Sequence, residues 1–183
     1  MHSVFEVADF FVDLAIKGAG DLISPLKINK LLYYAQGNFL AKYNAPLFPE
    51  KIQAWQYGPV IPEIYHKYKV LGRQPIEIVD EDYSASIFTP EETTFLLDIA
   101  REYGKYSAET LVTKTHSEDP WKSAFNGSPN TIISDASMQE YFRKHPVKSF
   151  SNVLHERVAS TTPQHTFPQY YFDPNEDIWW DER

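Results

Sequence analysis

The fold of this chain is decided by the stretch Leu26-Lys27-Ile28-Asn29-Lys30-Leu31-Leu32-Tyr33-Tyr34-Ala35-Gln36-Gly37, in which apolar residues recur at the spacing of one helical face. Ser24-Pro25 precedes it as an N-cap followed by proline at the first helical position. We expect a helix that ends before Asn44-Ala45-Pro46. Its buried stripe is expected to be Ile28, Leu31, Leu32, Ala35 and Phe39. Tyr33 and Tyr34 are about 100° apart on such a helix, so we expect them at the core edge, either packing there or contacting a partner.

Helices are also predicted on both sides of this stretch. Ser3 and Glu6 form a capping-box pattern before a helix that Lys17-Gly18 closes. Thr89-Pro90-Glu91-Glu92 combines an N-cap, a proline and a capping-box glutamate. Further helices are expected to start at Pro62, after Ser107 and after Ser134.

A small β element is expected near residues 76–88. Ile76-Glu77-Ile78-Val79 alternates as a strand does, and Ser86-Ile87-Phe88 could pair with it across an acidic turn. Prolines and a glycine interrupt residues 46–62, so this part is predicted to be an irregular loop with a short extended piece at 52–57. The predicted fold is therefore mainly α with a small antiparallel β element, in a compact helical domain of residues 1–150.

The composition narrows the function classes. The chain has 183 residues and a net charge of −8, which disfavours direct contact with nucleic acid or an anionic membrane and suits a basic partner. It has no cysteine, which excludes disulfides, thiol catalysis and cysteine-containing zinc sites. Neither a signal-peptide pattern nor an apolar stretch near the ~20 residues of a membrane span is present. We therefore expect a cytoplasmic protein.

The pattern changes beyond residue 150. Residues 151–183 hold six acids (Glu156, Asp173, Glu176, Asp177, Asp181, Glu182) against two bases (Arg157, Arg183), with prolines and aromatic residues between them. We predict an acidic-aromatic C-terminal extension that either packs on the domain or folds on a basic partner. In the second case, which we favour, its aromatic residues supply buried area and its carboxylates steer the encounter. The candidate partner-binding residues are Tyr170, Tyr171, Phe172, Asp177, Trp179 and Trp180.

Two further blocks stand out in the sequence. They are Trp55-Gln56-Tyr57-Gly58-Pro59-Val60 and Thr115-His116-Ser117-Glu118-Asp119-Pro120-Trp121. Together with residues 26–37, and in this order, they resemble the signatures of the Panacea-domain (SocA-like) antitoxin family. The resemblance covers roughly residues 5–145 and leaves the extension outside it. One departure is Asn29, where the family pattern has glutamine.

The resemblance implies a function. Members of this family neutralise a protein toxin encoded beside them by direct contact, and the resemblance implies the same here, with no enzymatic activity, no cofactor and an association with phages or prophages. A cognate protein toxin is thus the expected partner, and a homodimer is compatible with it. One family member instead delivers its toxin to a protease as an adaptor, which is the first alternative. A hydrolytic enzyme centred on His116 is the second.

The second block offers candidate contact residues. Tyr57-Gly58-Pro59 predicts a tight turn, in which glycine relaxes the backbone and proline fixes its own φ. With Trp55 beside it, the turn is either a surface anchor of the kind that dominates interface energetics or a corner that defines the fold. We include Trp55, Tyr57 and Pro59 among the partner-binding candidates.

The third block invites a metal-site or general-base interpretation of His116, Glu118 and Asp119. Their spacing is not that of His-Glu-x-x-His, and no second histidine lies nearby in the sequence. We therefore expect structural or contact roles, with no metal site and no catalytic residue. His116 is expected to hydrogen-bond backbone near a helix end, and Pro120-Trp121 to begin a short helix with a buried indole.

Overall fold

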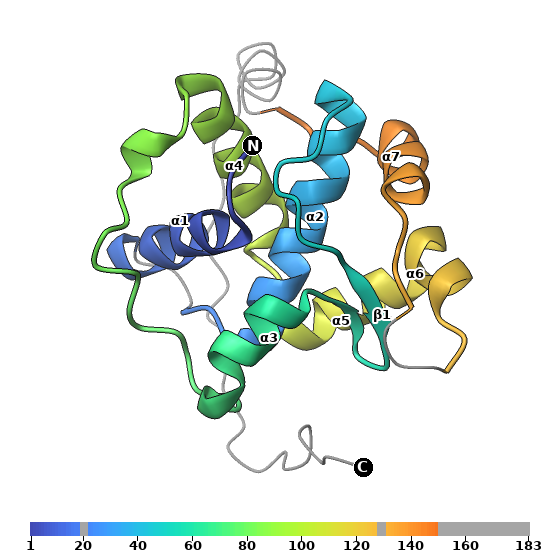
Figure 1. Cartoon of the computed structure of the whole chain (residues 1–183), viewed down its shortest axis with the longest axis horizontal. Helices are drawn as coiled ribbons and strands as arrows, with labels where there is room; N and C mark the ends of the chain where they lie inside the picture. Colours follow the sequence, from blue (N-terminus) through green and yellow to red (C-terminus); the bar gives the residue numbers. More distant parts are fainter. Residues whose placement is uncertain (19–21, 128–130, 150–183) are drawn as a thin grey trace, which may run out of the picture. The chain divides into compact units, whose positions relative to one another are not determined.

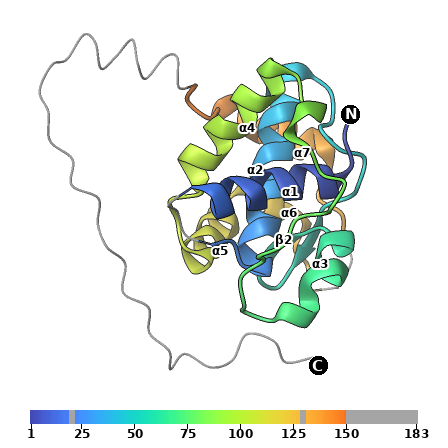
Figure 2. The same cartoon turned by 90° about the vertical axis from the view of Figure 1, so that its left-hand side faces the viewer.

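The computed structural model describes residues 1–18, 22–127 and 131–149, and these form a mainly helical domain with one small antiparallel sheet, as predicted. The elements appear in Figures 1 and 2. They are, in order, α1 (Val4–Lys17), α2 (Pro25–Tyr43), β1 (Gln53–Trp55), β2 (Gly58–Val60), α3 (Pro62–Tyr68), the 3-10 helices η1 (Lys69–Leu71) and η2 (Ala85–Ile87), α4 (Pro90–Tyr103), α5 (Ala108–Ser117), α6 (Asp119–Ala124) and α7 (Asp135–Lys144).

Helix α2 runs through the middle of the domain, where both views show other helices on several sides of it (Figures 1 and 2). It contacts α1, α3, α4, α5, α7 and β2. The predicted stripe is buried, but so are polar residues on the remaining faces: Lys27, Asn29, Lys30, Gln36 and Asn38. Several of these are satisfied by hydrogen bonds to backbone, as buried polar groups must be. From Lys27 to Leu40, α2 is therefore a core helix that is buried on all of its faces.

Helix α2 packs tightly against α7 at Gly37. A Cβ built there would lie 2.2 Å from the ring of Phe142 on α7, so only glycine fits. The same phenylalanine packs edge-on against Tyr33 and Tyr34. Gln139 adds a hydrogen bond from its Nε2 to the Leu40 carbonyl, 2.9 Å away. Helix α7 thus covers the middle of α2.

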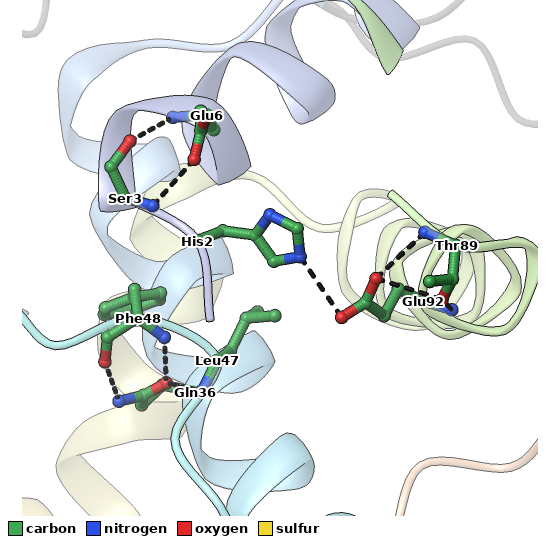
Figure 3. A network of polar contacts seen from close by, with 8 residues as sticks. All are labelled: His2, Ser3, Glu6, Gln36, Leu47, Phe48, Thr89 and Glu92. Carbon is green, nitrogen blue, oxygen red and sulfur yellow. Dashed lines mark hydrogen bonds and ion pairs between the residues drawn. The ribbon is translucent and has the colours of Figure 1, made fainter. Parts of the chain in front are cut away.

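The predicted capping boxes are confirmed, and a hydrogen bond joins them (Figure 3). Ser3 and Glu6 cap α1 reciprocally, and Thr89 and Glu92 do the same for α4. His2 Nε2 lies 3.1 Å from Glu92 Oε1. Burial acts to raise the pKa of Glu92, but the hydrogen bonds from Thr89 and His2 outweigh it and hold that pKa below its usual value. The starts of two helices far apart in sequence are therefore tied together.

The small β element lies at β1 and β2 rather than near residues 76–88, so its predicted position is wrong. The strands pair antiparallel, with Gln53 opposite Val60 and Trp55 opposite Gly58. Residues 76–79 form no strand: Ile76 is buried, whereas Ile78 is 79% exposed. The predicted partner strand at 86–88 lies partly in the 3-10 helix η2 instead. The N-cap of η2, Ser84, accepts a hydrogen bond from the Ser86 N–H. Apolar and polar residues alternate at 76–79, but no second strand among the described residues lies beside them to form a pair.

A third stretch of backbone lies along the other edge of β1. The N–H of Ala54 donates to the Thr131 carbonyl, and the N–H of Ile133 donates to the Ile52 carbonyl, both at 2.8 Å. Strand β1 therefore lies between β2 and residues 131–133, and β2 is at the edge of the sheet.

Two other predictions bear on the organisation of the chain. No helix of the described residues combines the length and apolar character that a membrane span needs. The extension at 151–183 lies outside the described residues. The division into a domain of residues 1–150 and an extension stays a prediction.

Candidate functional site

The three sequence blocks converge in one place. Helix α2 supplies Lys30, Tyr33 and Tyr34, and the β1–β2 hairpin supplies Trp55, Gly58 and Pro59. The remaining residues come from α5, from α6 and from the junction between them, and α5 contacts both α2 and β2. We call the following ten residues the motif cluster: Lys30, Tyr33, Tyr34, Trp55, Gly58, Pro59, Thr115, His116, Glu118 and Trp121.

Glu118 occupies the centre of the cluster. It is the C-cap of α5 and the N-cap of α6, and it is buried. Its two carboxylate oxygens accept hydrogen bonds from the Tyr33 and Tyr34 hydroxyls, each at 2.9 Å. Burial raises the pKa of Glu118 to about 7, although both tyrosine hydrogen bonds and the cation of Lys114 act in the opposite direction. Both carboxylate oxygens are therefore used in hydrogen bonds that link α2 to the α5–α6 junction.

The two tyrosines are completely buried, so their predicted place at the core edge is wrong. Tyr34 stacks on Tyr103 with ring centroids 3.7 Å apart. Burial, reinforced by the Glu118 charge, raises the pKa of both hydroxyls. Both hydroxyls can enter the core because the buried carboxylate accepts them. The prediction assumed that one of two neighbouring tyrosines must face outward. This assumption does not hold here, because other elements cover the helix on all sides at these positions.

Lys30 is a fully buried lysine whose burial was not predicted from the sequence. Its Nζ donates to the Pro59 carbonyl at 2.9 Å. Burial lowers the pKa of the Lys30 amine to about 7. The neighbouring Asn29 accepts a hydrogen bond from the Ile61 N–H at 2.9 Å. Two adjacent side chains of α2 thus hydrogen-bond the β2 end of the hairpin.

Gly58 lets the hairpin approach α2 and α5 closely. Its φ of +94° lies in the region that favours glycine. A Cβ built there would lie 2.7 Å from Thr115 Oγ1 and 2.9 Å from Lys30 Cε. Glycine is therefore required both for the turn and for the packing beneath it.

The candidate contact residues of the hairpin fall into two groups. Trp55 and Tyr57 are half-buried, whereas Pro59 is buried and belongs to the base of the turn. Trp55 Nε1 donates to Gln53 Oε1 at 2.8 Å, and its ring packs edge-on against Tyr65 of α3. Its carbonyl accepts from Trp121 Nε1 at 3.0 Å. The candidates in the extension (Tyr170, Tyr171, Phe172, Asp177, Trp179 and Trp180) lie outside the described residues.

His116 has the structural surroundings that the sequence predicted. Burial and the nearby Lys30 lower its pKa, while a hydrogen bond with the Gln56 backbone acts in the opposite direction. Its ring stacks on Trp121 at 4.0 Å, and this buried indole lies in the first turn of α6, as expected. Asp119 is exposed. Within the described ranges, no group of three or more His, Asp and Glu residues could hold a metal ion.

Comparisons with known proteins agree with the three blocks. The family model for "Antitoxin SocA-like, Panacea domain" matches residues 28–122, a range that includes the whole motif cluster. Antitoxin SocA of Caulobacter vibrioides (strain NA1000 / CB15N) is 31% identical over 155 residues, which cover 75% of this chain and 80% of that protein. No solved structure matches.

Proposed function

This chain belongs to the SocA-like Panacea-domain family of antitoxins, and from that premise we propose that it neutralises a cognate protein toxin by direct binding. Family membership supports an antitoxin role that rests on binding rather than on catalysis. The proposal also includes a cytoplasmic location and no direct contact with nucleic acid. It is compatible with a monomer or a homodimer.

The observation that carries the proposal is the construction of the 55–58 turn. Trp55 and Tyr57 remain partly exposed while the backbone around them is held by Lys30, Asn29 and Trp121. Aromatic side chains dominate binding energy at many interfaces. A surface that is already ordered loses less conformational entropy on binding. A fixed turn with two aromatic residues is therefore suited to anchoring a protein partner.

The buried part of the cluster supports a binding role in another way. Both oxygens of Glu118 accept hydrogen bonds from tyrosines, and the His116 ring stacks on Trp121. A general base needs to reach the proton that it removes. A carboxylate whose two oxygens are occupied in this manner, as in Glu118, suits a scaffold that fixes the turn.

We further propose that residues 1–150 form the shared scaffold and that residues 151–183 add specificity. The extension carries four of the eight net negative charges of the chain, six acids against two bases. Charges of one sign accelerate association with an oppositely charged partner. A basic toxin is therefore the expected partner. Trp179 and Trp180 are the proposed anchors of the extension.

Expression of the whole native operon, followed by purification of the full chain, tests direct binding. We expect a neighbouring gene product to co-purify in a fixed ratio and to lose its toxicity in a purified system without a protease. Neutralisation that requires a protease would support the adaptor alternative. Loss of toxicity through covalent change of the toxin or its product would support an enzyme.

Two double variants locate the contact. Trp55→Ala with Tyr57→Ala removes the aromatic residues of the turn, and Trp179→Ala with Trp180→Ala removes those of the extension. Each is expected to weaken binding by about tenfold or more, mainly through faster dissociation. Unchanged kinetics for one pair would remove that surface from the proposal. A chain shortened to residues 1–150 should keep its melting temperature and lose affinity.

A further inference from the structure

We propose that Lys30 is a positioning residue for the 55–58 turn: from inside the core it holds the edge strand β2, and thereby keeps Trp55 and Tyr57 in the arrangement that a partner binds. This inference rests on the proposed function, because it concerns the same contact surface. It assigns a role to a residue that touches no partner.

The geometry of the edge strand comes first. Strand β2 pairs with β1 on one side only. On its other side, the Pro59 carbonyl accepts from Lys30 Nζ and the Ile61 N–H donates to Asn29 Oδ1, both at 2.9 Å. Edge strands leave such groups unpaired unless something covers them. Two consecutive side chains of α2 therefore take the place of a neighbouring strand.

The cost of burying Lys30 indicates that stability is not the reason for its presence. An ammonium group in the core loses its hydration and needs several acceptors to replace it. Among the described residues no carboxylate lies within 4.0 Å of Lys30 Nζ. Replacement of this buried amine by an apolar side chain removes its desolvation cost, which we expect to offset the cost of leaving the Pro59 carbonyl without its donor. A methionine would fill the same space at lower cost, yet it could not bind Pro59.

The position of Lys30 also connects it to the turn itself. Its Cε and Nζ lie beneath Gly58, 2.9 Å and 3.3 Å from where a Cβ would be. Gly58 pairs with Trp55 in the hairpin, and the Trp55 carbonyl is held by Trp121. Displacement of the β2 edge is therefore transmitted across one pair of residues to the aromatic tip.

The test uses the full chain with Lys30→Met, and with Lys42→Met as the matched control on the exposed part of the same helix. We expect Lys30→Met to melt at the wild-type temperature or above it. Its amide hydrogens at residues 54–58, 60 and 61 should exchange about three- to tenfold faster, which corresponds to the loss of one hydrogen bond. The protein that co-purifies from the native operon should dissociate faster by a similar factor. Lys42→Met should change none of these quantities.

A second variant approaches the same edge independently. Asn29→Ala removes the acceptor of the Ile61 N–H and should also accelerate exchange at the same amides. Unfolding or a lower melting temperature in Lys30→Met would show that Lys30 serves stability and would overturn the proposal. Wild-type exchange in the hairpin of Lys30→Met would overturn it as well. Faster hairpin exchange together with unchanged binding in the Trp55→Ala, Tyr57→Ala variant would leave positioning intact and instead refute the turn as the contact.

Discussion

Two connections between helices differ in whether their sequence pattern predicts the secondary structure that they form. The hairpin connection, residues 44–61, joins α2 to α3 and contains both strands; the surface connection, residues 72–88, joins η1 to α4 and contains neither. The surface connection has the better alternation of apolar and polar residues. The hairpin connection has hydrogen bonds from buried side chains of α2. In this domain, strands form where the core supplies polar anchors, not where the alternation is strongest.

The largest expected effect comes from the hairpin glycine Gly58, for which Gly72 in the surface connection serves as the comparison. Gly58→Val requires an unfavourable φ and a clash with Thr115 and Lys30, so we expect a loss of about 3–5 kcal/mol in the free energy of unfolding or no folded protein. Gly72 also has a positive φ, but a Cβ there meets nothing within 4 Å. Gly72→Ala should cost about 1–3 kcal/mol, from backbone strain alone. Chemical denaturation of both variants checks this, and equal losses would contradict the comparison.

Two isoleucines of the surface connection should behave differently. Ile76 is 2% exposed, so Ile76→Ala is expected to cost about 2–4 kcal/mol. Ile78 is 79% exposed, and Ile78→Ala should stay within about 0.5 kcal/mol of the wild type. Urea melts measure both. A large loss for Ile78→Ala would mean that this connection is packed as a strand would be.

Two buried ionisable groups of the motif cluster, Glu118 and Lys30, predict a dependence of stability on pH. The pKa of Glu118 in the folded chain, about 7, lies above its ordinary 4.5, so the folded chain holds the extra proton and stability falls as pH rises between these values. The pKa of Lys30, about 7, lies below its ordinary 10.5, so the unfolded chain holds the extra proton and stability rises with pH above about 7. These two groups together predict lowest stability near neutral pH, with limbs of roughly 3 kcal/mol each between pH 4.5 and 9.

Melting temperatures between pH 4.5 and 9 measure this dependence, in a range where tyrosine ionisation does not interfere. Glu118→Gln should flatten the acid limb and Lys30→Met the alkaline limb. If both limbs persist in both variants, the dependence comes from other groups.

The smallest effect is expected at the local anchor of the surface connection. Ser84 Oγ accepts a hydrogen bond from the Ser86 N–H at 3.3 Å in an exposed position. Ser84→Ala should therefore cost no more than about 0.5 kcal/mol. Hydrogen exchange in the β1–β2 hairpin should be unchanged. Any effect on the hairpin would show that the two connections are energetically coupled.

Local signals in the sequence predicted the helices well. Caps such as Ser3, Ser24 and Thr89 act through neighbouring residues, so their outcome depends little on the rest of the chain. The start of the short helix α6 was predicted from Pro120 in the same way. The sequence blocks also identified the residues that form the motif cluster, although not how they would pair.

The buried polar residues could not be predicted in this way. Lys30 lies between Ile28 and Leu31, and nothing local distinguishes it from a lysine in solvent. Its environment is set by the Pro59 carbonyl, 29 positions away, and that of Tyr33 by Glu118, 85 positions away. The position of the sheet failed for the same reason, since pairing is decided by distant partners.

The covering of α2 by α7 has a consequence for synthesis on the ribosome. Gln139 and Leu40, which are hydrogen-bonded in the folded domain, are separated by 99 positions. At ~5–20 residues per second, roughly 5–20 seconds pass between the emergence of the two. Throughout that interval, the surface around Gly37 that Phe142 later covers is open to chaperones and proteases. A nascent chain that stops before α7 lacks this cover, so the contact between Gly37 and Phe142 forms only after almost the whole domain has been synthesised.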